Sequence, residues 1–133
     1  MRSLSPSILY VDDNADSCEV ISLMLNFADD KYDVTTVDSA DKALDLIERW
    51  DYDLYILDYR LPEIDGIELC RLIRRSDTVT PIIFYSGAAY KAERELAMAA
   101  GANAYLVKPN DLDNLTETVK LFLTENVQFF VNH

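Results

Sequence analysis

Short apolar runs alternate with longer amphipathic stretches along the chain. Four such runs, each flanked by polar or turn-forming residues, lie at residues 8–11, 54–57, 82–85 and 104–107. Their pattern predicts strands that are buried on both faces of a sheet. A fifth segment, residues 32–37, mixes apolar residues with one aspartate and two threonines. This composition indicates a strand with one wetter side, which we expect at the edge of the sheet.

Apolar residues at helical spacing fill the segments between these strands. The five stripes are Cys18, Ile21, Leu25 and Ala28; Ala40, Ala43, Ile47 and Trp50; Ile67, Cys70 and Ile73; Ala89, Ala92, Leu96 and Ala99; and Leu112, Leu115, Val119 and Phe122. Each stripe predicts a helix with one apolar face. We expect Ser39 and Asp111 to cap the second and fifth helices, and Gly101 to end the fourth in a left-handed turn.

Strict alternation of five strands with five helices predicts parallel pairing through right-handed crossovers. The fold class is therefore α/β, a doubly wound parallel sheet. The length of 133 residues fits one domain, which we place at residues 1–124, followed by a short C-terminal tail at 125–133. The tail contains an apolar run at 127–131, which we expect to pack on the domain, with contact to a partner or a second subunit as the alternative.

The charge balance excludes several classes of partner. Lys and Arg number 12 and Asp and Glu number 24, which gives a formal charge of −12. This charge opposes direct nucleic-acid binding. No uncharged run approaches the roughly 20 residues that cross a bilayer, and no secretory signal is visible, so we expect no membrane insertion and a cytoplasmic location. Cys18 and Cys70 lie on apolar helical stripes and are expected to be buried free thiols.

Polar residues follow four of the five predicted strands. Asp12 and Asp13 follow the first, Asp58 the third, Ser86 the fourth and Lys108 the fifth. In a doubly wound sheet the carboxyl ends of the strands face one ligand crevice, so these side chains should meet there. Carboxylates 4 Å apart repel by about 1 kcal/mol in water and about 4 kcal/mol at an effective dielectric of 20. Lys108 and a hard divalent ion such as Mg²⁺ would offset that repulsion.

Four segments at these strand ends carry a family resemblance. They are Val-Asp-Asp at 11–13, Leu-Asp-Tyr-Arg-Leu-Pro-Glu-Ile-Asp-Gly at 57–66, Ser-Gly-Ala at 86–88 and Gly-Ala-Asn-Ala-Tyr-Leu-Val-Lys-Pro at 101–109. Over about residues 6–124 the chain resembles a response-regulator receiver domain of two-component signalling, of the chemotaxis-receiver type. The resemblance implies a flavodoxin-like fold: a five-stranded parallel sheet of order 2-1-3-4-5 with five helices.

The resemblance also implies roles for the acids. Asp58 would be the phosphoacceptor, a carboxylate nucleophile. Asp13, Asp58 and the backbone carbonyl of Arg60 would bind Mg²⁺, and Asp12 would hold a metal-bound water. Considered alone, Asp12 or Asp13 could simply cap the first helix. Their joint placement with Asp58 favours the metal site.

Further roles follow from the resemblance for residues at the ends of the fourth and fifth strands. Ser86 and Lys108 would contact the phosphoryl group, with a cis Lys108–Pro109 bond aiming the lysine inward. Tyr105 matches the aromatic switch residue, whose ring fills space that opens when Ser86 moves. Without that context Ser86 reads as a turn residue and Tyr105 as an ordinary strand residue.

The implied function is that of a phosphoacceptor rather than a turnover enzyme, one that catalyses its own phosphorylation and slow dephosphorylation. Its partners would be a sensor histidine kinase or histidine phosphotransfer protein and a downstream protein target, with a phosphorylation-dependent homodimer as a further option.

Two alternative functions remain. An aspartyl-phosphate hydrolase would need a second acid where Arg60 stands. An adaptor that binds partners without phosphorylation is opposed only by the complete set of site residues. Flavin binding lacks a hydroxyl-rich first loop.

The side chain of Arg60 has no role assigned by the resemblance. Ala88, on the facing loop, is too small to oppose it, so the sequence offers the guanidinium only a phosphoryl group or solvent as partner. If the guanidinium covers the phosphoryl group, it should hinder the in-line approach of water; a merely solvated side chain is the alternative.

Overall fold

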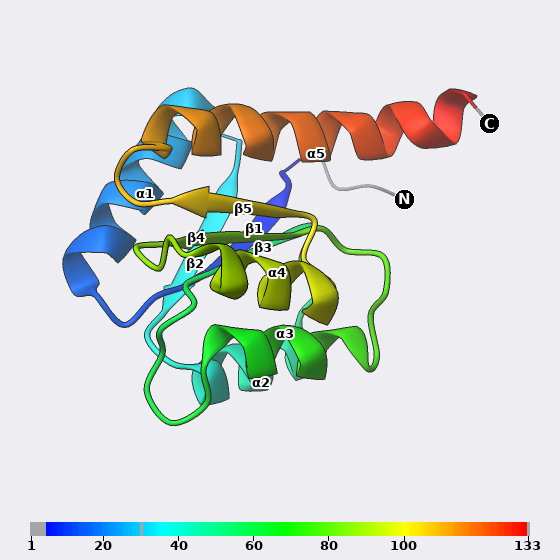
Figure 1. Cartoon of the computed structure of the whole chain (residues 1–133). Coiled ribbons are helices and arrows are strands. Elements are labelled where there is room, and N and C mark those ends of the chain that lie inside the picture. The colour runs from blue at the N-terminus through cyan, green and yellow to red at the C-terminus, as the bar shows by residue number, and fades with distance from the viewer. Residues whose placement is uncertain (1–4, 30, 133) are drawn as a thin grey trace.

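Five parallel strands form one sheet in the order β2-β1-β3-β4-β5 (Figure 1). The strands are β1 (Ser7–Val11), β2 (Asp33–Val37), β3 (Leu54–Leu57), β4 (Ile82–Ser86) and β5 (Ala104–Val107). This computed structural model describes the backbone of residues 5–29 and 31–132, and side chains as far as residue 124. The topology confirms the predicted doubly wound parallel sheet, and the mixed segment at 32–37 supplies the edge strand β2.

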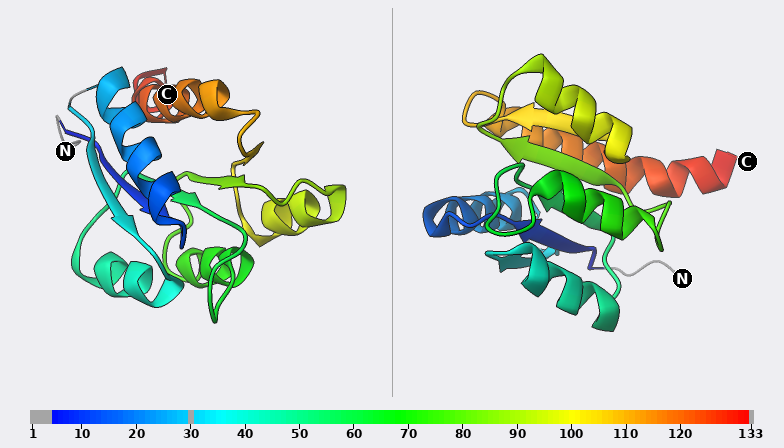
Figure 2. Two further views of the ribbon diagram at one scale, coloured as in Figure 1. Left: turned by 90° about the vertical axis from the view of Figure 1, so that its left-hand side faces the viewer. Right: turned by 60° about the horizontal axis from the view of Figure 1, so that its bottom comes forward.

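Helices cover both faces of the sheet. They are α1 (Ala15–Ala28), α2 (Ala40–Arg49), α3 (Gly66–Arg74), α4 (Lys91–Ala100) and α5 (Leu112–Asn132). Helices α1 and α5 lie on one face, and α2, α3 and α4 lie on the other (Figure 2). The two cores contain alternate strand residues: Ile8 and Tyr10 of β1 pack on the first side, whereas Leu9 and Val11 pack on the second. This alternation follows from the period of two along a strand.

The helix ends agree with the sequence at two of three predicted caps. The hydroxyl of Ser39 accepts the Lys42 N–H at the start of α2, and Gly101 ends α4 with φ 117°. Asp111 precedes α5, but its side chain accepts the Val107 N–H and the Asn114 side-chain amide instead of a helix backbone amide. The start of α1 is capped by Asn14, which leaves the two acids before it free for other contacts.

The apolar stripe predicted for α4 does not lie on the buried face of the helix. Its four members, Ala89, Ala92, Leu96 and Ala99, are all exposed, and Ala97 is the buried residue of the helix. Glu93, one turn earlier, is only 18% exposed. Ala97 directly follows Leu96, so the buried face of the helix is displaced by about one residue from the predicted stripe. A similar error affects Trp50, which lies at the C-cap of α2 and is 62% exposed.

Residues 125–132 continue α5 as helix, where the sequence predicted a short tail (Figure 1). No glycine or proline interrupts the chain between Leu112 and Asn132, so nothing local stops helix propagation after residue 124. The division into a domain at 1–124 and a separate segment at 125–133 stays a prediction. The packing expected for the apolar run 127–131 lies outside the described side chains.

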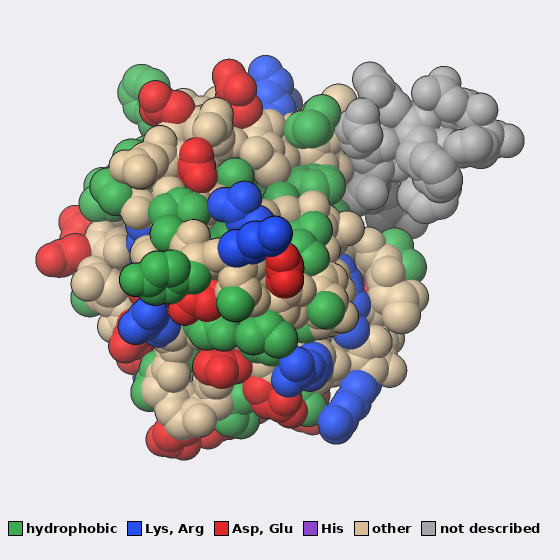
Figure 3. Space-filling model, viewed as in Figure 1, with side chains coloured by type: hydrophobic (Ala, Val, Ile, Leu, Met, Phe, Trp, Pro, Cys, Tyr) green, Lys and Arg blue, Asp and Glu red, His purple; other side chains and the backbone are tan. Residues whose placement is uncertain are grey.

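Among the described residues, no helix is both long and apolar enough to cross a membrane. Cys18 and Cys70 are free thiols; Cys70 is buried as predicted, whereas Cys18 is only half-buried. Acidic and basic side chains are interspersed on the face that carries α4 (Figure 3). The net charge of −12 therefore does not appear on this face as a separate acidic patch (Figure 3).

Candidate functional site

The carboxyl ends of four strands bring the predicted polar residues into one cavity. Asp12 and Asp13 follow β1, Asp58 follows β3, Ser86 ends β4 and Lys108 follows β5. All five line a cavity of about 520 Å³ at this edge of the sheet. Parallel strands end at the same edge, which is why residues so distant in the chain meet here.

The acids of this cavity form a compact oxygen cluster. One carboxylate oxygen from each of Asp12, Asp13 and Asp58 lies within 4.8 Å of the others. Asp12 is fully buried and Asp58 is 7% exposed, whereas Asp13 is open to solvent. Closely spaced anionic oxygens, two of them buried, suit a hard divalent cation such as Mg²⁺, which prefers carboxylate, carbonyl and water ligands. The donor set therefore fits the metal that the sequence predicted.

Lys108 supplies a positive charge to two of these acids. Its ammonium group donates to Oδ2 of Asp58 at 2.9 Å and also contacts Oδ2 of Asp12. Burial lowers the pKa of Lys108, but the hydrogen bonds to the two carboxylates outweigh that effect and leave the pKa above its ordinary value. The lysine is thus held charged between the two buried acids. The Lys108–Pro109 bond is cis, as the resemblance implies.

Asp12 has a further partner that the sequence analysis did not identify. The hydroxyl of Tyr10 donates to its Oδ2 at 2.7 Å, and the Asn14 N–H donates to its Oδ1 at 2.9 Å. Burial and the adjacent charge of Asp12 raise the pKa of Tyr10, so the phenol stays protonated and acts as a donor. A spacing of two residues along a strand places both side chains on one face, and this signal was present in the sequence.

Asp58 is surrounded by hydrogen-bond donors. Its Oδ1 accepts the Ser86 hydroxyl at 2.6 Å and the Arg60 N–H at 3.1 Å, while its Oδ2 accepts from Lys108. Gly66 allows the following loop to pack closely against it, because a Cβ there would lie 2.1 Å from the Asp58 backbone oxygen. The acid is therefore fixed in place by backbone and side chains together.

Tyr105 connects β5 to the loop that follows β4. Its ring is 8% exposed and stacks on Phe84 with centroids 5.7 Å apart, and its hydroxyl donates to the Ala88 carbonyl. Burial raises the pKa of Tyr105 to about 12. Ala88 N–H in turn donates to the Ser86 hydroxyl at 3.2 Å. A continuous chain of contacts therefore runs from Asp58 through Ser86 to the predicted switch tyrosine.

The expectation that Arg60 has only a phosphoryl group or solvent as partner is wrong. Its guanidinium Nη2 lies 3.6 Å from Oε2 of Glu93, in the first turn of α4. Glu93 is not among the residues of the apolar stripe predicted for α4. The side chain of Arg60 is still 73% exposed and lines the cavity that contains Asp58.

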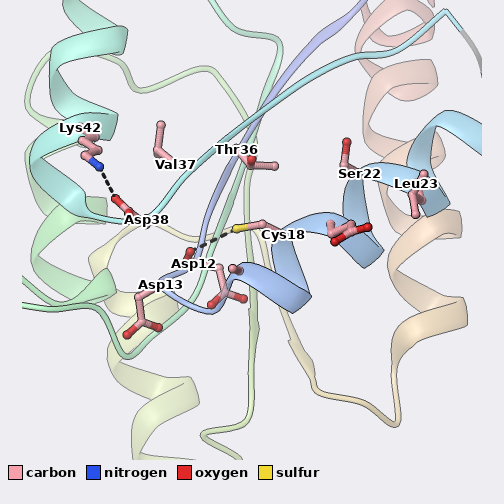
Figure 4. A pocket seen from close by; sticks show the side chains of 11 residues that line it. Asp12, Asp13, Cys18, Ser22, Leu23, Thr36, Val37, Asp38 and Lys42 are labelled. Carbon is pink, nitrogen blue, oxygen red and sulfur yellow. Dashed lines mark hydrogen bonds and ion pairs between the residues drawn. The ribbon is translucent and has the colours of Figure 1, made fainter.

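A second cavity, of about 570 Å³, lies beside the first and shares Asp12 and Asp13 with it. It is lined by residues of α1 and the β2–α2 connection, including Cys18 and an exposed Lys42–Asp38 ion pair of 2.9 Å (Figure 4). The Cys18 thiol donates to the Asp12 backbone oxygen at 3.2 Å (Figure 4). Asp12 and Asp13 thus line both cavities, whereas Asp58 lines only the first.

Comparisons with known proteins agree with this geometry. A family model described as response regulator receiver domain matches residues 8–120. The cell cycle response regulator CtrA of Brucella ovis is 33% identical over 108 residues, which cover 81% of this chain and 46% of that protein. The chain therefore spans about half the length of the curated relatives it matches.

Solved structures show the same fold. A CheY-like receiver domain protein from Methanospirillum hungatei superposes with a TM-score of 0.85 and 28% identity, over 92% of this chain and 97% of that one. The BeF3-activated N-terminal receiver domain of RstA from Klebsiella pneumoniae gives a TM-score of 0.81 and 29% identity, over 88% of this chain and 97% of that one. The family match runs from β1 into α5 and includes every strand end that bears a site residue, so this chain belongs to the response-regulator receiver domains of two-component systems.

Proposed function

We propose that Asp58 accepts a phosphoryl group and that its phosphorylation switches a protein-binding surface. The observation that carries this proposal is the set of donors around its carboxylate, from Ser86, Lys108 and the Arg60 amide, at the wall of an open cavity. In the transfer, a carboxylate oxygen of Asp58 forms a bond to phosphorus as the bond to the donor's leaving group breaks. Water later reverses the modification and releases inorganic phosphate.

Asp13, Asp58 and the Arg60 backbone carbonyl would hold Mg²⁺, and Asp12 would act through a bound water. When bound, the ion would neutralise charge on the transferring phosphoryl group and align it. Support comes from the cluster of three carboxylates within 4.8 Å. Lys108 already spans Asp12 and Asp58, so its ammonium group is placed to contact a phosphoryl oxygen on Asp58 without leaving the cavity.

Ser86 and Tyr105 would carry the signal away from the site. The Ser86 hydroxyl now donates to Asp58 and would donate to a phosphoryl oxygen after transfer. Its movement would pull on Ala88, whose carbonyl accepts the Tyr105 hydroxyl. Phosphoryl charge would thus bias the arrangement of the β4–α4 loop and the first turn of α4, which is a two-state element of the kind that phosphorylation controls.

A sensor histidine kinase or a histidine phosphotransfer protein would supply the phosphoryl group in the cytoplasm, and a downstream protein would recognise the switched surface. Receiver domains as a class act between such partners. The RstA receiver, described as BeF3-activated, supports a switchable fold of this type. A homodimer formed on phosphorylation is an alternative use of the same surface.

The test is incubation with acetyl phosphate and Mg²⁺, followed by intact-mass measurement. We expect one added phosphoryl group on the wild-type chain and none on Asp58→Asn. Asp113→Asn, which removes an exposed acid of α5, is the matched control and should be modified normally. Incorporation that survives Asp58→Asn, or that is insensitive to chelation of the metal, would contradict the mechanism. A wild-type chain that takes up no phosphoryl group would favour the adaptor alternative.

A further inference from the structure

The Arg60–Glu93 ion pair connects the loop after β3 to the first turn of α4. Arg60 Nη2 lies 3.6 Å from Glu93 Oε2. At its other end, Arg60 is anchored to the acceptor, because its backbone N–H donates to Asp58 Oδ1 at 3.1 Å. The side chain also lines the cavity that contains Asp58. One residue therefore touches Asp58 through its backbone and α4 through its guanidinium.

The two partners of this ion pair differ in how strongly the surrounding structure holds their side chains. Oε1 of Glu93 accepts the Tyr90 N–H at 3.1 Å at the start of α4, and the side chain is 18% exposed. A carboxylate at a helix N-terminus is further stabilised by the helix dipole. The Arg60 side chain is 73% exposed. The carboxylate is thus fixed, and the guanidinium is the partner free to move.

A phosphoryl group on Asp58 would offer this guanidinium a stronger anion. A phosphoryl group brings close to two negative charges and several acceptor oxygens, and a guanidinium can bond it with two donors. An ion pair at 3.6 Å whose guanidinium is mostly exposed is weak by comparison. We infer that Glu93 is a positioning residue that holds Arg60 off the acceptor and competes with the phosphoryl group for it. This inference rests on the proposed function of Asp58.

The competition would set the lifetime of the phosphorylated state. In hydrolysis a water oxygen attacks phosphorus on the side opposite the Asp58 oxygen, and the phosphorus–oxygen bond to Asp58 breaks. Inorganic phosphate leaves, the Asp58 carboxylate is restored, and the attacking water gives up a proton to the phosphate or to solvent. Arg60 lying over the phosphoryl group hinders that in-line approach. Glu93 removes Arg60 from this position for part of the time and so accelerates the decay.

The test separates the charge of Glu93 from its capping role. Glu93→Gln keeps a side-chain oxygen for the Tyr90 N–H, since the amide oxygen of glutamine also accepts a hydrogen bond, but removes the charge that pairs with Arg60. Decay of the phosphorylated chain is followed by intact mass in excess Mg²⁺ after removal of acetyl phosphate. We expect a lifetime about threefold longer than wild type, which corresponds to about 0.7 kcal/mol in the barrier.

The matched control is Glu95→Gln, on the same helix and paired with Lys91 at 3.7 Å, which should leave the lifetime unchanged. Arg60→Met should shorten the lifetime, and adding Glu93→Gln to Arg60→Met should have no further effect. A merely structural role of Glu93 would not depend on Arg60 in this way.

An unchanged or shorter lifetime in Glu93→Gln overturns the inference. An equal lengthening in the Arg60→Met background also overturns it, because Glu93 would then act on the phosphoryl group without Arg60. These results differ from failure of the proposed function, in which the wild-type chain itself takes up no phosphoryl group on Asp58.

Discussion

The phenol of Tyr10 lies beneath the acid cluster and donates a 2.7 Å hydrogen bond to Oδ2 of Asp12. Both residues are fully buried, and Tyr10 also packs in the core between the sheet and helices α1 and α5. This core residue is therefore also a partner of the proposed metal site. Groups that hydrogen-bond to metal-site carboxylates orient those carboxylates. Loss of such a group typically weakens metal binding by roughly 10- to 100-fold.

Tyr10→Phe is expected to fold normally and to bind Mg²⁺ about tenfold more weakly, because the ring stays and the donor to Asp12 is lost. Titration calorimetry with Mg²⁺ measures the change. Tyr55→Phe is the control, a buried strand tyrosine in the core on the other face of the sheet. Equal Mg²⁺ affinity in wild type and Tyr10→Phe would remove Tyr10 from the site.

Lys108→Met should lower the free energy of unfolding by about 3 kcal/mol in the absence of metal, since it leaves two buried carboxylates without their cation. Excess Mg²⁺ should restore part of that loss. Urea unfolding with and without chelator measures both effects. Lys42→Met, which removes an exposed ion pair with Asp38, should change stability by less than about 1 kcal/mol.

The stability difference between wild type and Lys108→Met should depend on pH. Because the folded-state pKa of Lys108 is raised, its stabilising charge is present below the unfolded value of about 10.4 and is lost as pH rises through the higher folded value. The difference between wild type and Lys108→Met should therefore persist at neutral pH and shrink only above about pH 10.4. A difference that vanished near pH 7 would show that the lysine is not held charged.

Gly66→Ala should destabilise the fold by about 2 kcal/mol or more, because the new Cβ would lie 2.1 Å from the Asp58 backbone oxygen and force the loop away. The displacement should also slow phosphorylation of Asp58. Gly87→Ala is the matched control, since a Cβ there meets no atom within 4 Å. Urea unfolding of the two variants checks the prediction, and equal stabilities would refute it.

Asp77→Asn should cost about 1–2 kcal/mol at neutral pH. Oδ1 of Asp77 accepts the Val79 and Thr80 N–H groups at 2.9 Å, and Oδ2 accepts the Thr80 hydroxyl at 2.6 Å. Burial raises the pKa of Asp77, but these hydrogen bonds outweigh it and lower the pKa below its ordinary value.

A lowered carboxyl pKa stabilises the fold above the unfolded value of about 3.9, and this stabilisation is lost as pH falls through the lower folded value. The urea midpoints of wild type and Asp77→Asn should therefore converge in acid and differ at pH 7. Asp51→Asn, at an exposed position after α2, should show no such difference. Midpoints that differ equally at both pH values would contradict the prediction.

The sheet and the position of the acids were predictable because both depend on local patterns. Two of the predicted strands, Leu54–Leu57 and Ala104–Val107, agree with the structure to the residue. Apolar runs of this length must be buried on both sides, and the residue after each one must lie at the carboxyl edge of the sheet. The placement of Asp58 and Lys108 at that edge therefore follows from the positions of the two apolar runs.

The contact of Glu93 was decided by tertiary structure, and that of Tyr10 only in part. The spacing of two residues places Tyr10 and Asp12 on one face, but the reach of the phenol to Oδ2 of Asp12 depends on how the ring packs in the core. Glu93 lies outside the apolar stripe predicted for α4, and the packing of the helix on the sheet places its carboxylate beside Arg60. Hydrophobic pattern specifies which residues leave water, but the pairing of polar atoms depends on how whole elements are rotated against one another, which no local pattern encodes.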